Sequence, residues 1–123
     1  MTDLIWGAAL ALIAVILGAF AAHALKKKFN PEQQLSFETG VRYQMYHALV
    51  LLIVGFAQSH QSLEPGAYTY LFILGTLLFS GSIYGLCLST VFGKKWRFLG
   101  PVTPIGGSLL VAAWVALLWA VIQ

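Results

Sequence analysis

Charged residues are scarce in this sequence. Only 9% of its 123 residues are charged, with seven Lys and Arg and four Asp and Glu. A soluble domain normally has about 25% charged residues. Hydrophobic residues make up 59% of the chain, so little of it remains for a soluble domain.

Cysteine is nearly absent, since Cys87 is the only one. A single thiol excludes an intrachain disulfide and a metal site built from several thiolates. The histidines show no His-x₃-His spacing, and no phosphate-loop or dinucleotide-binding fingerprint is present. We therefore expect no metal, no cofactor and no catalytic residue, and we interpret the chain as non-enzymatic.

Four long apolar stretches are what the sequence does contain. They cover residues 4–25, 39–58, 67–90 and 104–122, and the helices that contain them are predicted over residues 4–25, 31–58, 66–90 and 104–122. Each has at least the ~17–25 residues that a helix needs to cross a bilayer core of about 30 Å. The sequence predicts an all-α integral membrane four-helix bundle, with residues 1–123 forming one domain.

Several helix ends are recognisable. Asn30 is expected to cap the second helix, with Pro31 at its first position and Gln33 completing a capping box. Thr103, followed by a proline, repeats this pattern before the fourth helix. Gly93 suits the left-handed position that ends the third helix.

The basic residues predict the orientation. Six of the seven lie in two clusters, Lys26, Lys27 and Lys28 and then Lys94, Lys95 and Arg97, in the two connections on the same side of the membrane. By the positive-inside rule that side is cytoplasmic, and both termini lie outside the cytoplasm. We expect these clusters to contact anionic lipid headgroups of the bilayer rather than nucleic acid.

Aromatic residues are expected at the membrane boundaries. The outer boundary would hold Trp6, Tyr68, Tyr70, Trp114 and Trp119, and the inner one Trp96 and Phe98.

The second apolar stretch contains ionisable residues. Glu38, Arg42 and Tyr46 lie within about 80° of one another around a helix, and the four-residue spacing from Glu38 to Arg42 suits an ion pair. Tyr43 and His47 occupy an adjoining stripe. Ionisable groups within a span usually face the bundle interior or water and have partners.

All four helices place polar or small residues toward the cytoplasmic half, which predicts a polar pocket opening inward. His23 should lie level with Glu38, where it either contacts Glu38 or lies in the headgroup layer as an interfacial histidine. The candidate pocket residues are His23, Glu38, Arg42, Tyr43, Tyr46, His47 and Thr103. The alternative is purely structural, with an ion pair, a hydrogen-bonded core histidine and an Arg42 side chain that extends to the headgroups.

Small residues recur at four-residue spacing in three of the spans, and Gly81 and Gly85 form a literal GxxxG. Such spacing favours close helix packing, either within one chain or between chains.

Three segments resemble the motifs of one family. Residues 18–25 have the sequence GAFAAHAL and resemble its GAFGAHAL motif, with Ala21 where glycine is usual. Residues 42–49 match its RYQMYHAL motif, and residues 100–107 (GPVTPIGG) resemble GPITPIGG. This is the bacterial domain-of-unknown-function family 423, small inner-membrane proteins related to eukaryotic transmembrane protein 256. The resemblance implies a four-helix protein of the bacterial inner (plasma) membrane and brings no established activity.

Three functions fit the sequence. The first is a non-enzymatic membrane protein that acts by helix association, with itself as a homo-oligomer or with another membrane protein, or by lipid binding at the inward-facing pocket. The second is a proton-coupled or small-molecule transport component that uses Glu38, Arg42 and His47. The third is a membrane enzyme that acts on lipid or quinone.

Overall fold

Four long helices account for nearly the whole chain in a computed structural model that describes residues 1–123. They are α1 (Thr2–Ala22), α2 (Pro31–Ser59), α3 (Tyr68–Val91) and α4 (Val102–Ile122), and a 3₁₀ turn, η1 (Arg97–Leu99), precedes α4. All four are long and apolar enough to cross a membrane. The predicted all-α four-helix architecture is confirmed.

The predicted ends of α2 and α3 are confirmed by their hydrogen bonds. Asn30 Oδ1 accepts a bond of 2.7 Å from the Gln33 amide, and Gln33 Oε1 accepts one of 3.0 Å from the Asn30 amide. Gly93 follows α3 with a φ of 94°. The amides of Gly93 and Lys94 donate to the carbonyls of Thr90 and Ser89, which is a Schellman ending that favours glycine.

The expected cap at Thr103 is wrong. α4 begins one residue earlier, at Val102, and has no side-chain cap. The Thr103 hydroxyl is instead hydrogen-bonded to the Ser82 hydroxyl on α3. A bond between two helices has therefore replaced the local bond that the sequence pattern suggests.

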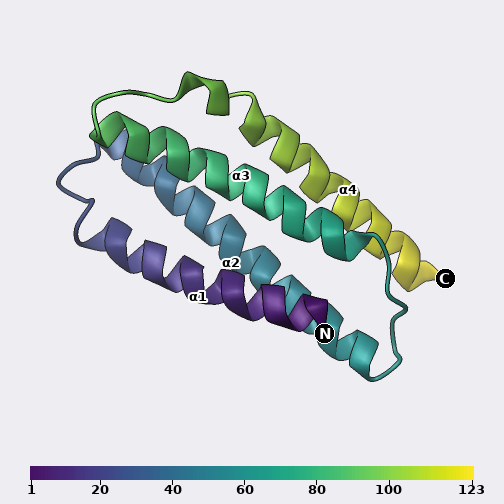
Figure 1. The fold of residues 1–123 in the computed structure, drawn as a ribbon. Helices are drawn as coiled ribbons and strands as arrows, with labels where there is room; N and C mark the ends of the chain where they lie inside the picture. The colour runs from purple at the N-terminus through teal and green to yellow at the C-terminus, as the bar shows by residue number, and fades with distance from the viewer.

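Consecutive helices run antiparallel and pack against each other (Figure 1). α2 and α3 are central, because 39% of each span is buried, against 22% of α1 and 17% of α4. The α1–α2 connection and the α3–α4 connection lie at one end of the molecule, which we call the basic end (Figure 1). The termini and the α2–α3 connection lie at the opposite end.

The core has two apolar clusters with polar side chains between them. The larger cluster lies toward the terminal end and contains Leu10, Ala48, Leu51, Val54, Tyr68, Phe72, Ile73, Leu110 and Ala113. The smaller lies at the basic end and contains Ala21, Phe29, Phe37 and Cys87. Gln44, Ser80 and Tyr84 occupy positions between these clusters along α2 and α3.

Close packing of α3 and α4 depends on a glycine outside the GxxxG pair. A Cβ at Gly106 would lie 2.3 Å from the backbone nitrogen of Phe79, so α4 lies directly against the α3 backbone there. Gly81, by contrast, faces open space, and Gly85 packs against the Leu99 side chain of η1. The GxxxG pair therefore takes no part in packing between the long helices of this chain.

Candidate functional site

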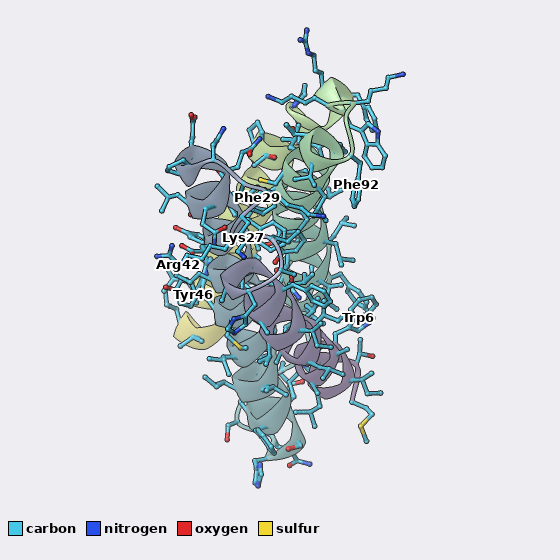
Figure 2. The ribbon with its side chains drawn as sticks, turned by 90° about the vertical axis from the view of Figure 1, so that its left-hand side faces the viewer. Trp6, Lys27, Phe29, Arg42, Tyr46 and Phe92 are labelled. Carbon is cyan, nitrogen blue, oxygen red and sulfur yellow. The ribbon has the colours of Figure 1, made fainter.

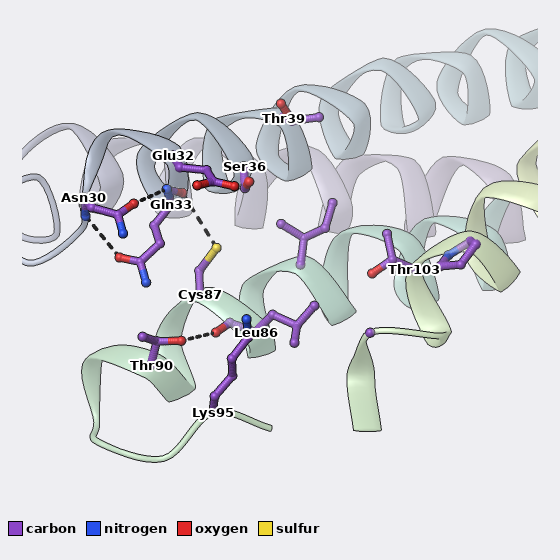
Figure 3. Close-up of a pocket in the computed structure, with 13 residues that line it drawn as sticks. Asn30, Glu32, Gln33, Ser36, Thr39, Leu86, Cys87, Thr90, Lys95 and Thr103 are labelled. Atoms are coloured by element: carbon purple, nitrogen blue, oxygen red, sulfur yellow. Dashed lines mark hydrogen bonds between the residues drawn. The ribbon is translucent and has the colours of Figure 1, made fainter. Parts of the chain in front are cut away.

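A polar pocket of about 650 Å³ lies at the basic end, between α2, α3, the α3–α4 connection and the start of α4 (Figure 3). Three of its thirteen lining residues are hydrophobic. The lining consists of Asn30, Glu32, Gln33, Ser36, Thr39, Ile83, Leu86, Cys87, Thr90, Lys95, Gly100, Thr103 and Pro104.

Helical periodicity places these side chains on facing walls. Glu32, Ser36 and Thr39 are separated by four and three residues, so they form one stripe on α2. Ile83, Leu86, Cys87 and Thr90 form a corresponding stripe on α3 at spacings of three, one and three. The pocket therefore lies between two rigid helices.

The pocket contains one charge of each sign. Glu32 projects from α2, and Lys95 projects from the connection after α3, so the charges come from opposite walls (Figure 3). Both residues are exposed, as are Asn30 and Gly100. The pocket is therefore open to the surface at the basic end.

The hydroxyl groups in the pocket offer acceptors. Thr39 donates to the Leu35 carbonyl and Thr90 to the Leu86 carbonyl, each at 2.9 Å. A hydroxyl that has donated its only proton retains lone pairs for a ligand's donors. These two threonines, with the Glu32 carboxylate, therefore suit a ligand that carries hydroxyl or ammonium groups.

Donors come from two other lining residues. The Gln33 side-chain oxygen is occupied by the Asn30 amide, which leaves its NH₂ group for a ligand. Lys95 supplies an ammonium group. The Cys87 thiol donates to the Gln33 carbonyl at 3.7 Å, so its proton has a partner within the wall. The structure holds no group of three or more His, Cys, Asp or Glu placed to bind a metal ion.

Toward the middle of the molecule, a side chain of α4 is hydrogen-bonded to a side chain of α2. The Trp114 indole nitrogen donates to Nε2 of His47 at 3.2 Å, and His47 Nδ1 lies 2.7 Å from the Tyr43 carbonyl. Because an indole N–H only donates, Nε2 is the acceptor and Nδ1 carries the proton. His47, which is 5% exposed, therefore has a partner at both nitrogens, and Trp114 is not simply a boundary residue.

The structure does not bring the seven predicted pocket residues together. Thr103 lines the pocket, and Tyr43 and His47 lie deeper along α2. Arg42 and Tyr46 are exposed and point away from the bundle (Figure 2). The sequence thus predicted a polar pocket at this end with a largely different set of residues.

Gln44 explains the orientation of Arg42. Two residues along a helix correspond to a rotation of about 200°, so the two side chains face opposite ways. A neutral amide is far less costly to bury than a guanidinium, provided that it is hydrogen-bonded. Gln44 is 3% exposed and has two partners, the Leu10 carbonyl and the Tyr84 hydroxyl. Its spacing from Gly40, His47 and Leu51 is the sequence signal that identifies this inward stripe.

The contacts of His23 and Glu38 differ from the contact between them that the sequence suggested. His23 is exposed just after α1. The Gln34 side-chain amide donates to the Ala21 carbonyl at 3.0 Å and to the Glu38 carboxylate at 3.1 Å. Gln34, rather than His23, therefore connects the end of α1 with Glu38.

The two basic clusters lie at the same end of the molecule, and all six of their side chains are exposed. Lys95 is the one that lines the pocket. Contact of these residues with lipid headgroups stays a prediction.

Comparisons with known proteins find relatives that are named as membrane proteins. Residues 17–107 match the family model described as "Protein of unknown function (DUF423)". The chain is 39% identical to the UPF0382 membrane protein SH2409 of Staphylococcus haemolyticus, over 94% of this chain and 90% of that one. It is 38% identical to the UPF0382 membrane protein YwdK of Bacillus subtilis (98% and 95% covered) and 37% identical to the UPF0382 inner membrane protein YgdD of Escherichia coli (98% and 88% covered). No solved structure was found to match the chain.

Proposed function

The chain belongs to the DUF423 family of membrane proteins of unknown function, and we propose that it is a non-enzymatic protein that binds an anionic phospholipid headgroup in the polar pocket. The observation that carries this proposal is the pocket itself. It is polar, it lies at the end that holds the basic clusters, and it contains Lys95 opposite a wall of acceptors.

The lining fits a phosphate that carries a hydroxyl-bearing group, such as phosphoglycerol. The Lys95 ammonium and the Gln33 NH₂ group supply donors for phosphate oxygens. Thr39, Thr90 and Glu32 supply acceptors for the glycerol hydroxyls. The acyl chains would then lie along the apolar outer surfaces of the helices.

The proposed location places the pocket at the cytoplasmic headgroup layer. A relative from Escherichia coli is named as an inner membrane protein. The positive-inside rule would put both lysine-containing connections in the cytoplasm and both termini outside it. Anionic lipid would then be available at the mouth of the pocket.

The transport alternative has less support. It assigns Glu38, Arg42 and His47 to one polar path, but Arg42 points away from the bundle and both His47 nitrogens are bonded within it. The enzyme alternative requires an activated nucleophile or acid–base pair. The Cys87 thiol is bonded to a backbone carbonyl instead of to a basic side chain.

Titration of the detergent-purified protein with phosphatidylglycerol, read by native mass spectrometry, tests the proposal. We expect one saturable site, with phosphatidylcholine bound at least about tenfold more weakly, because its headgroup has no hydroxyl donor. Lys95→Glu and Thr39→Val should each weaken phosphatidylglycerol binding, Lys95→Glu by about tenfold.

Lys27→Glu is the matched control. It makes the same change of net charge at the same end, but Lys27 does not line the pocket. Equal weakening by Lys27→Glu and Lys95→Glu would show nonspecific attraction to the basic end and would exclude the pocket as the binding site.

A further inference from the structure

The outward face of α2 differs from an ordinary lipid-facing surface because it contains a pair of opposite charges. Glu38 and Arg42 are exposed on this face, followed by the exposed side chains of Tyr46, Leu49 and Ile53. Figure 2 shows Arg42 and Tyr46 close together at one edge of the molecule. Neither α1, α3 nor α4 covers this stripe.

Arg42 lies about one turn inside the apolar part of α2, which begins near residue 39. It is eleven residues after Pro31, which corresponds to about 16 Å along the helix at 1.5 Å per residue. A guanidinium that faces hydrocarbon is costly, and such residues normally find a counter-charge. Within the chain Arg42 forms no ion pair. Oε1 of the nearby Glu38 accepts a hydrogen bond of 3.1 Å from the Gln34 side-chain amide.

The missing counter-charge is present on an identical surface of a second copy. We propose that the outward face of α2 is the interface of a homodimer, in which Arg42 of each copy pairs with Glu38 of the other. A surface that carries both signs is self-complementary, as a two-fold interface requires. Gln34 engages only Oε1 of Glu38, so Oε2 is free to accept the guanidinium.

The geometry of two parallel helices allows this pairing. Two copies inserted in the same direction have their two-fold axis along the membrane normal, so the two α2 helices run parallel. Glu38 is one turn closer to the basic end than Arg42, a distance that the long arginine side chain spans. Toward the other end, Arg42, Tyr46, Leu49, Ile53 and Phe56 follow at intervals of four, three, four and three residues. That alternation is the spacing of a helix–helix seam.

This interface goes beyond lipid binding and does not depend on it, because the pocket lies on a different face of α2. Glu32, Ser36 and Thr39 line the pocket, whereas Glu38 and Arg42 do not. Loss of headgroup binding in Lys95→Glu should therefore leave the dimer intact. The competing occupant of this face is a lipid phosphate, bound by an Arg42 side chain that extends toward the headgroups.

Disulfide crosslinking in membranes locates the interface. In a Cys87→Ser chain, Leu49→Cys places a thiol on the proposed seam without touching the charge pair. Val115→Cys on α4 is the matched control. Val115 is 61% exposed, against 48% for Leu49. It also lies at a similar depth, because its neighbour Trp114 is level with His47. We expect Leu49→Cys to form a crosslinked dimer and Val115→Cys to form none. Equal crosslinking of both, or none from Leu49→Cys, overturns the proposal.

Charge reversal then separates a second copy from lipid. Arg42→Glu and Glu38→Arg should each weaken dimerisation by about tenfold, the size of polar contacts between membrane helices. The chain that carries both changes should recover the crosslink, because the exchanged charges pair again. Unchanged crosslinking in Glu38→Arg, or no recovery in the double variant despite an unchanged melting temperature, would assign Arg42 to a lipid phosphate or another protein instead.

Discussion

The hydroxyl of Tyr84 on α3 donates a hydrogen bond of 2.7 Å to Oε1 of Gln44 on α2. The same Gln44 side chain donates a bond of 2.7 Å to the Leu10 carbonyl on α1. One buried amide therefore joins three helices. Lipid tails are as apolar as leucine, so membrane helices are held together mainly by close packing and by polar contacts of this kind.

Removal of the Tyr84 hydroxyl should destabilise the bundle. Tyr84→Phe leaves the buried Gln44 oxygen without its donor, which should lower the free energy of unfolding by about 1 kcal/mol. Thermal unfolding in detergent measures the change. Tyr70→Phe is the control, because Tyr70 is 68% exposed. An equal melting temperature for Tyr84→Phe and the unaltered chain would contradict a stabilising role for this bond.

Gly106 and Gly107 should respond differently to alanine. A Cβ at Gly106 would lie 2.3 Å from the Phe79 nitrogen, whereas one at Gly107 would make an ordinary contact of 3.6 Å with the Phe79 ring. Gly106→Ala should therefore lower the free energy of unfolding by about 1–3 kcal/mol, the usual cost of overpacking, while Gly107→Ala has a much smaller effect. The same detergent melts compare them, and equal losses would show that α4 does not rest on the α3 backbone.

His47 should be a single neutral tautomer with its proton on Nδ1. The Trp114 indole donates to Nε2, so only Nδ1 can donate to the Tyr43 carbonyl. Nitrogen-15 NMR of labelled histidine distinguishes the two ring nitrogens. Trp114→Phe should shift the Nε2 signal, whereas Trp119→Phe, which alters an exposed indole, should not. A proton found on Nε2 would contradict the bond to Trp114.

The orientation is testable with thiol labelling in intact cells. In a Cys87→Ser chain, Ser62→Cys lies in the α2–α3 connection and Lys27→Cys in the α1–α2 connection, and both positions are exposed. A membrane-impermeant thiol reagent applied from outside should label Ser62→Cys at once and Lys27→Cys only after permeabilisation. The reverse order of labelling would place the basic end outside the cytoplasm.

Local sequence patterns predicted the helices well. The apolar stretches gave four spans whose ends lie within three residues of those observed, and the signals at Asn30, Gln33 and Gly93 operate as expected. Each of these features depends on residues that are neighbours in sequence. Thr103 is the exception, because its hydroxyl has a partner on another helix.

The pocket residues were harder to predict. Periodicity groups Glu38, Arg42 and Tyr46 on one face of α2 correctly, but it does not say whether that face points into the bundle. Ser36 and Thr39 line the pocket from α2. Their stripe has no buried charged residue, so the sequence pattern did not single it out. Only the positions of α3 and the α3–α4 connection show that this stripe encloses a cavity.

The sequence by itself determined that this is a four-helix membrane protein with its basic residues at one end, because hydrophobic length and charge scarcity act along a single chain. The tertiary structure decided which side of each helix is inside. Gln44 is buried and Arg42 is exposed, since an amide can satisfy its hydrogen bonds with Leu10 and Tyr84, whereas a guanidinium buried at that position would also need a counter-charge beside it.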